Sequence, residues 1–86
     1  MENAIQDFID HLHKDKQTSQ NTEISYKRDL KKLASFLLEN GIDTFTDATR
    51  TNLDAFVLYM EKKDFAASTI SRSVASVRAL YQYLFR

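Results

Sequence analysis

The chain contains no proline, no cysteine, no tryptophan and a single glycine among its 86 residues. A β-sandwich or barrel needs turn residues at most strand ends, so their scarcity favours helices throughout. Without cysteine, neither a disulfide nor a thiolate metal site can form, which is typical of a cytoplasmic protein. No apolar run approaches the ~18 residues that span a membrane, and the N-terminus has no signal-peptide pattern. We therefore expect a soluble, cytoplasmic protein.

The length and composition allow one compact domain. Of the 86 residues, 43% are hydrophobic, which suffices for one core and no more. No internal repeat, low-complexity segment or linker divides the chain. We therefore expect residues 1–86 to form a single domain.

The chain has no net charge, because its twelve basic and twelve acidic residues cancel, but it is rich in charged residues. Residues 1–18 and 39–66 carry an excess of acids, whereas residues 19–38 and 67–86 carry an excess of bases. The last of these segments holds three arginines and no acid. Alternating basic and acidic segments indicate separate faces, of which the basic ones are suited to a polyanion.

Apolar residues recur at helical spacing in segments that predict helices over 2–14, 20–39, 50–63 and 67–85. The expected core residues are Ile5, Phe8, Ile9 and Leu12; Tyr26, Leu30, Leu33 and Leu37; Leu53, Phe56, Val57 and Met60; and Ile70, Val74, Val77, Leu80, Tyr81, Leu84 and Phe85. The short connections between the helices make antiparallel or steeply crossed neighbours. The predicted fold is an all-α, four-helix orthogonal bundle.

Polar residues mark the helix ends. Thr18, Ser19 and Asn21 are capping candidates for the second helix, and Ser68 or Thr69 can cap the fourth. Gly41 follows the second helix, where glycine can adopt the left-handed conformation that closes a helix. In the connector that follows, Ile42 and Phe45 are expected to lie under the bundle.

Little in the sequence supports enzyme chemistry. His11 and His13 lie on different helix faces with no third ligand at metal spacing, so we interpret them as surface histidines. No glycine-rich phosphate loop and no nucleophile-histidine-acid arrangement is recognisable. We expect no catalytic residue, metal or cofactor in this segment.

The outward faces of the second and fourth helices favour nucleic-acid binding. With Ile70 at the centre of the core face of the fourth helix, the opposite face collects an arginine, hydroxyl side chains and alanines. An arginine can reach a guanine edge or a phosphate, and small residues let a DNA backbone come close. The candidate DNA contacts are Asn21, Ser25, Lys27, Arg28, Lys31, Ser68, Thr69, Arg72 and Ser76. A solvated surface explains the same pattern, and for Arg78 a structural salt bridge competes with a DNA contact.

Two stretches carry a family resemblance. "NTEISYKRDLKKLASFLLENG" and "STISRSVASVRALYQYL" resemble, in order and spacing, two segments of the tyrosine recombinases of the phage-integrase and Xer type. The matching positions are Thr22, Tyr26, Asp29, Leu30, Phe36, Gly41, Thr69, Ile70, Arg72, Val74, Val77, Arg78, Tyr81 and Leu84. For Thr22 and Asp29, near the core edge, we expect local hydrogen bonds.

The resemblance implies the N-terminal, SAM-like core-binding domain of a recombinase that acts in DNA integration and recombination. In that family the second and fourth helices usually contact double-stranded DNA, while the following catalytic domain performs strand exchange. The chain would then be a domain excised from a longer recombinase, and no tyrosine in it inherits the nucleophile's role. The first helix, with Ile5, Phe8 and Leu12, packs in the core or contacts a neighbouring protomer in a homo-oligomer on DNA.

Some positions depart from the family pattern. Asp64 stands where glycine is frequent at a turn, which Asp tolerates. Ala66 stands where a capping serine is common, and Ser68 where a basic residue is common, so one phosphate contact is lost. Two alternatives remain: a helical protein-interaction module without DNA binding, and a helix-turn-helix regulator, for which the "KKDFAAS" connection is long.

Overall fold

The computed structural model describes all 86 residues and contains helices but no strand. The main helices are α1 (Glu2–His11), α2 (Gln20–Glu39), α3 (Arg50–Lys62) and α4 (Ala67–Leu84). A π-helical segment (Leu12–Lys16) extends α1, and a short 3₁₀ turn (Phe45–Asp47) lies between α2 and α3. The predicted all-α, four-helix class is confirmed. None of the helices combines the length and the apolarity that a bilayer span requires.

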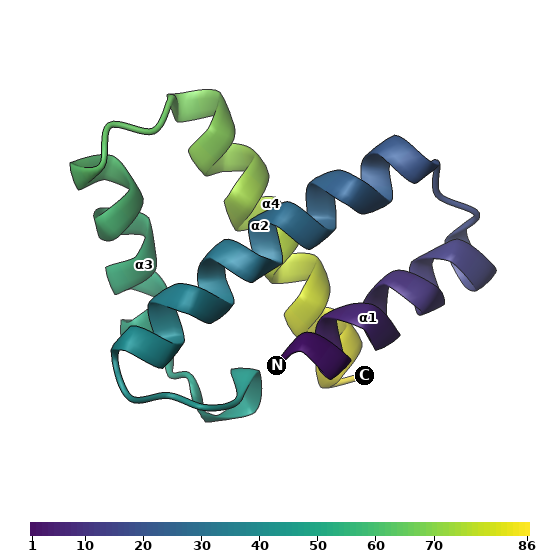
Figure 1. Cartoon of the computed structure of the whole chain (residues 1–86), viewed down its shortest axis with the longest axis horizontal. Coiled ribbons are helices and arrows are strands. Elements are labelled where there is room, and N and C mark those ends of the chain that lie inside the picture. The colour runs from purple at the N-terminus through teal and green to yellow at the C-terminus, as the bar shows by residue number, and fades with distance from the viewer.

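The helices form two hairpins that cross each other. In Figure 1, α1 and α2 form one hairpin, α3 and α4 the other, and α2 crosses α4 near the middle of both helices. The molecule is flat, with principal extents of 35 × 27 × 18 Å. The crossing of α2 and α4 therefore holds the two hairpins together.

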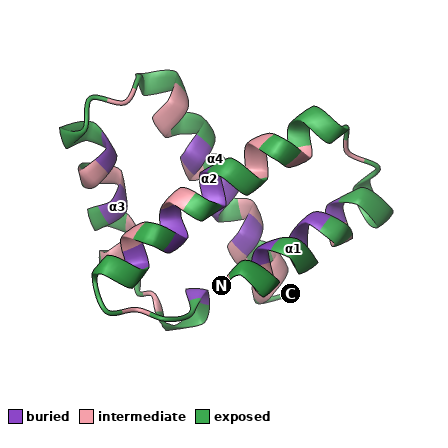
Figure 2. Cartoon of the chain, viewed as in Figure 1, coloured by how far each residue is buried: buried purple, intermediate pink, exposed green.

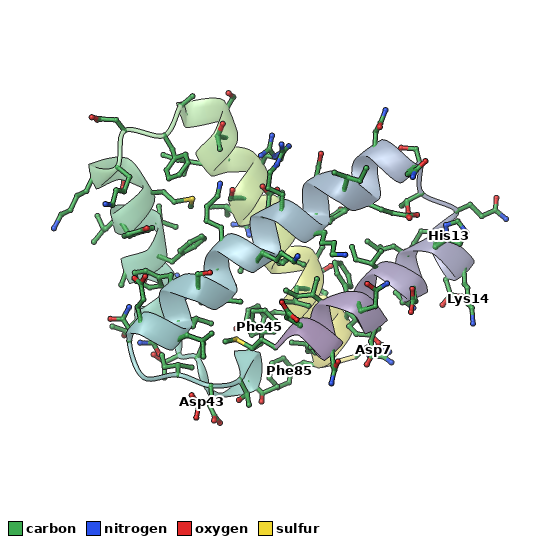
Figure 3. All side chains as sticks on the ribbon, viewed as in Figure 1. Asp7, His13, Lys14, Asp43, Phe45 and Phe85 are labelled. Carbon is green, nitrogen blue, oxygen red and sulfur yellow. The ribbon has the colours of Figure 1, made fainter.

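The core lies where the hairpins meet. Figure 2 shows buried residues along the inner stripes of all four helices. The buried apolar residues are Ile5, Phe8, Ile9, Leu12, Leu30, Leu33, Ala34, Leu37, Phe45, Phe56, Met60, Val77 and Leu80. Most of the predicted stripe residues are in this set or packed against it. Phe45 lies on the inner side of the connector and Asp43 on its outer side (Figure 3).

Left-handed residues end two of the helices. Gly41 has φ +77°, and the amides of Gly41 and Ile42 donate to the carbonyls of Leu38 and Leu37. Asp64 has φ +59°, and the amides of Asp64 and Phe65 donate in the same way to Glu61 and Met60. Both are Schellman closures, so the predicted roles of Gly41 and of the turn at Asp64 are confirmed.

The helix starts follow the predicted chemistry in one case and not in another. The Ser19 hydroxyl accepts from the Thr22 amide at 3.2 Å, as predicted for the second helix. Thr49 and Asn52 form a capping box at the start of α3. The prediction that Ser68 or Thr69 caps the fourth helix is wrong, because α4 begins at Ala67 and its N-cap, Ala66, offers no side-chain acceptor.

The corner between α1 and α2 is tied by polar side chains. Thr18 donates to Glu23 at 2.7 Å, and His13 forms a hydrogen bond of 3.1 Å with the same carboxylate oxygen. The bond from Thr18, followed by that from His13, lowers the pKa of Glu23. The corner is thus fixed by side chains of both helices.

The turn between α3 and α4 is shorter than the sequence suggested. It runs from Lys63 to Ala66 only, because Lys62 at one end of the "KKDFAAS" stretch belongs to α3, and Ala67 and Ser68 at the other end belong to α4. Turn length therefore does not argue against a helix-turn-helix, but the arrangement does: α3 and α4 run side by side in opposite directions (Figure 1), whereas a helix-turn-helix joins its helices at about 90–120°.

Candidate nucleic-acid interface

A buried carboxylate joins α2 to α4 at the crossing of the two hairpins. Asp29 has no exposed surface. Its Oδ2 accepts from Arg72 Nε at 3.1 Å and from Ser76 Oγ at 2.9 Å, and its Oδ1 accepts from Arg72 Nη2 at 2.9 Å. A fully buried carboxylate is costly unless it is paired and hydrogen-bonded, and here both oxygens have partners.

This network explains a difference between the predicted and the observed orientation of α4. The buried residues of α4 are Ser73, Ser76, Val77 and Leu80. Their mean direction is about 70° away from Ile70, which was placed at the centre of the core face, at 100° per residue. Phe85, expected on the core face, is accordingly 68% exposed.

The prediction that Ser76 lies on the outward face is therefore wrong. Ser76 is only 4% exposed, and its hydroxyl is committed to Asp29. A wheel centred on apolar residues gave no weight to a serine that faces a buried acid. The expectation of only local bonds is also wrong for Asp29, whose partner Arg72 lies 43 residues along the chain. For Thr22 it is confirmed, because Thr22 bonds with Ser19.

Arg72 lies at the edge of a polar groove between α2 and α4. Its side chain is 43% exposed, and the groove has a volume of about 280 Å³. The bonds to Asp29 and its negative charge raise the pKa of Arg72, so the guanidinium is always charged. The groove is lined by Thr22, Ser25, Tyr26, Arg72, Ala75 and Ser76. Of the predicted contacts, the structure brings Ser25, Arg72 and Ser76 together here.

The predicted basic residues of α2 are divided between two flanks. Lys27 and Lys31 line a hollow against the start of α1, together with Glu2 and Gln6. The groove with Arg72 lies on the other side of α2. Arg28 is exposed on the ridge between the two flanks, and it forms no ion pair. The second helix therefore presents its cations around its outer half and not on one flat face.

The remaining candidates lie at the surface. Asn21 and Ser68 are exposed, and Thr69 is half-buried. Arg78 is exposed and forms no ion pair, and it lines a separate, mostly apolar groove between α3 and α4. No group of three or more His, Cys, Asp or Glu is placed to hold a metal ion. The polar groove is thus the part of the surface where a fixed arginine and hydroxyl side chains meet.

Sequence reasoning missed the role of Asp29 in this site. A sequence signal for the pairing existed, because Asp29 matches the family pattern in the first quoted stretch and Arg72 matches it in the second. A buried acid is costly unless it is paired, and of the two arginines on α4, Arg72 is the one that faces Asp29. The pairing of the two residues depends on how α2 and α4 pack, which the local sequence does not specify.

Comparison with known proteins identifies relatives of the whole chain. The family model described as "Phage integrase, N-terminal SAM-like domain" matches residues 5–86. Tyrosine recombinase XerC of Listeria monocytogenes is 32% identical over 81 residues, which is 94% of this chain and 27% of that protein. A putative tyrosine recombinase of Caldanaerobacter subterraneus is 32% identical over 84 residues, covering 98% of this chain and 29% of that protein.

Tyrosine recombinase XerD of Oceanobacillus iheyensis is also 32% identical, over 87 residues that cover 100% of this chain and 29% of that protein. The chain thus spans between 27% and 29% of the length of these relatives. No solved structure matches significantly.

Proposed function

The chain belongs to the family of phage integrase N-terminal SAM-like domains, and from this membership we propose that it binds double-stranded DNA as the core-binding domain of a tyrosine recombinase. One observation supports the binding role beyond the family. A charged arginine is fixed at the edge of an open groove between α2 and α4, the two helices with basic outer faces.

The proposed contacts divide by position. Arg72, Ser25, Ser68, Thr69 and Asn21 approach the duplex from the side of the groove. Arg28, on the outer ridge of α2, contacts a phosphate, because an unpaired guanidinium can donate bidentately to phosphate oxygens. Lys27 and Lys31 contact phosphates where the duplex passes over the opposite flank of α2. Ser76 supports the site from beneath through Asp29.

We further propose that this domain works beside a catalytic domain in a longer recombinase, acting where the cell's DNA is, in the cytoplasm. The relatives are named tyrosine recombinases and are several times longer than this chain. The domain positions the duplex, and strand exchange is assigned to the catalytic domain. No residue of this chain is given a catalytic role.

An oligomer on DNA also stays a proposal. Ile5, Phe8 and Leu12 are between 1% and 7% exposed, so these residues pack in the core. A contact between protomers through α1 therefore has to use its outer face, which carries Glu2 and Asp7.

The salt dependence of binding tests the main proposal. If roughly 3–5 phosphates are neutralised, log Kobs against log salt has a slope of about −3 to −4.5 for duplex DNA. The double substitution Arg28→Ala with Arg72→Ala lowers the affinity for duplex DNA. Arg50→Ala with Lys62→Ala on α3 removes the same two positive charges outside the proposed site and leaves the affinity unchanged. Fluorescence anisotropy with a labelled duplex measures both.

Binding that does not depend on salt, or that survives the double substitution, contradicts the proposal. The alternative to DNA binding is a role as a protein-interaction module, which one observation favours. An apolar groove of about 340 Å³ lies between α3 and α4, and its apolar lining consists of Leu53, Phe56, Val57, Val74 and Val77. This alternative predicts a concentration-dependent dimer or a protein partner, with NMR shifts in α3 and no effect of DNA.

A further inference from the structure

We infer that Arg72 reads base edges in the DNA and that Asp29 is the positioning residue that fixes it. The inference rests on the proposed function, which assigns DNA to this surface but not a role to each arginine. It distinguishes Arg72 from the other basic residues of the site, which contact phosphates.

The first argument is orientation. An arginine carries five N–H donors in a rigid, planar fork. Asp29 accepts one hydrogen bond from Nε and one from Nη2 of Arg72. Asp29 is itself fully buried, so the residues packed around it hold its carboxylate in place. The donors that remain, on Nη1 and Nη2, are fixed relative to the two helices. A fixed pair of donors suits the bidentate contact with O6 and N7 of guanine.

The second argument is charge. A phosphate that binds Arg72 comes close to the carboxylate of Asp29, which bonds to the same guanidinium at 2.9 Å. Two anions on one arginine repel each other, and the buried carboxylate is poorly screened. A base edge is neutral and meets no such repulsion. The pairing with Asp29 therefore favours a base over a phosphate as the partner of Arg72.

The third argument is the contrast with the cations of α2. Lys27, Arg28 and Lys31 are exposed and form no ion pair. Their side chains are free to follow the DNA backbone, and their full charge is available for counterion release. The site thus holds two kinds of cation. Arg72 is held in place and its charge is offset by Asp29, whereas Lys27, Arg28 and Lys31 are free to move and have no acidic partner.

The surface around Arg72 leaves room for a base edge. Ala75 and Ser68, three residues after it and four before it, lie on the same side of α4 and are exposed. Both side chains are small, so neither blocks an approach to the donors. Ser25, across the groove on α2, can add a hydroxyl contact.

Selection from a random duplex library, followed by sequencing, tests the inference with the 86-residue chain. The wild type enriches a guanine at one position. Arg72→Ala loses this preference by about 5- to 150-fold, the discrimination expected of one bidentate contact. Arg72→Lys keeps the charge but not the fork, and it loses the same preference. Arg28→Ala keeps the preference and makes the salt slope less steep by about 0.9.

Asp29→Asn weakens the guanine preference and, because it removes the negative charge beside Arg72, raises the unselective affinity. Because Asp29→Asn and Arg72→Ala both disrupt the buried ion pair and can unfold the domain, the helix content of each is checked by circular dichroism. Arg72→Lys, which keeps a cation beside Asp29, provides the test if either variant is unfolded. A wild-type preference that Arg72→Ala and Arg72→Lys both retain overturns the inference. So does a salt slope that changes with Arg72→Ala as much as with Arg28→Ala. A wild type that binds no duplex at all overturns the proposed function itself.

Discussion

Two serines on α4, three residues apart, lie in opposite polar environments. Ser76 Oγ donates to Asp29 Oδ2 at 2.9 Å. Ser73 Oγ is fully buried and has no hydrogen-bond partner. A buried polar atom without a partner costs free energy, whereas a bond to a charged group contributes more than an ordinary one. The same residue type is therefore unfavourable at one position and stabilising at the other.

This contrast predicts opposite effects of one substitution. Ser73→Ala removes the unpaired hydroxyl and favours the helix, and it raises the free energy of unfolding by about 0.5–2 kcal/mol. Ser76→Ala leaves Asp29 with one donor fewer and lowers the free energy of unfolding by about 1.5–3 kcal/mol. Urea denaturation followed by circular dichroism measures both. If the two variants shift stability in the same direction, the described network is not what distinguishes these serines.

At the scale of elements, one tyrosine attaches the connector between α2 and α3 to α4. The Tyr81 hydroxyl donates to the carbonyl oxygen of Phe45 at 2.6 Å, and the two rings meet edge to face with centroids 6.5 Å apart. Burial raises the pKa of Tyr81 to about 12. The short 3₁₀ turn that carries Phe45 thus depends on a neutral tyrosine.

The raised pKa predicts a loss of stability in alkali. The folded state binds the phenolic proton more tightly than the unfolded state, so the contribution is complete below the ordinary pKa of 10.0 and is lost as the pH rises from there through about 12. Tyr81→Phe removes this part of the pH dependence and, at neutral pH, lowers the free energy of unfolding by about 0.5–1.5 kcal/mol.

The control is Tyr59→Phe, because the hydroxyl of Tyr59 forms no hydrogen bond in the structure. Urea denaturation at a series of pH values between neutrality and pH 12 gives the comparison. An unchanged alkaline slope in Tyr81→Phe would show that the connector is held by other contacts.

At the scale of the whole molecule, the two hairpins share one core. Leu30 on α2 and Leu80 on α4 both have no exposed surface, and they belong to the same cluster as residues of α1 and α3. Neither hairpin encloses a separate core of its own. The domain is therefore expected to unfold in one step, with all four helices lost together.

Leu80→Ala tests this shared core. The cavity that it leaves lowers the free energy of unfolding by about 2–5 kcal/mol, a large part of the roughly 4–12 kcal/mol expected for a domain of this size. Leu58→Ala, at a position 57% exposed, changes it by less than about 0.5 kcal/mol. In urea titrations followed by NMR, the signals of α1 and α3 disappear at one midpoint. Separate midpoints for the two hairpins would refute the single core.

The sequence by itself determined the elements. The predicted helices over 20–39, 50–63 and 67–85 agree with α2, α3 and α4 to within a residue at each end. The spacing of the apolar residues, the cap at Ser19 and the left-handed Gly41 all depend on interactions between residues a few positions apart. Such interactions can be predicted from the sequence. The family resemblance also came from the sequence, and the comparisons confirm it.

Only the tertiary structure decided which side of α4 faces the core, because that depends on how α2 crosses it. The crossing places Asp29 against α4, and a buried carboxylate requires donors, so Arg72 and Ser76 turn toward it although apolar residues were available elsewhere on the helix. A helical wheel considers only the apolarity of residues within one helix, so it cannot account for a hydrogen-bond partner 43 residues away. The sequence thus determined that Arg72 belongs to the polar side of α4, and the packing of the two hairpins decided that it is held there by Asp29.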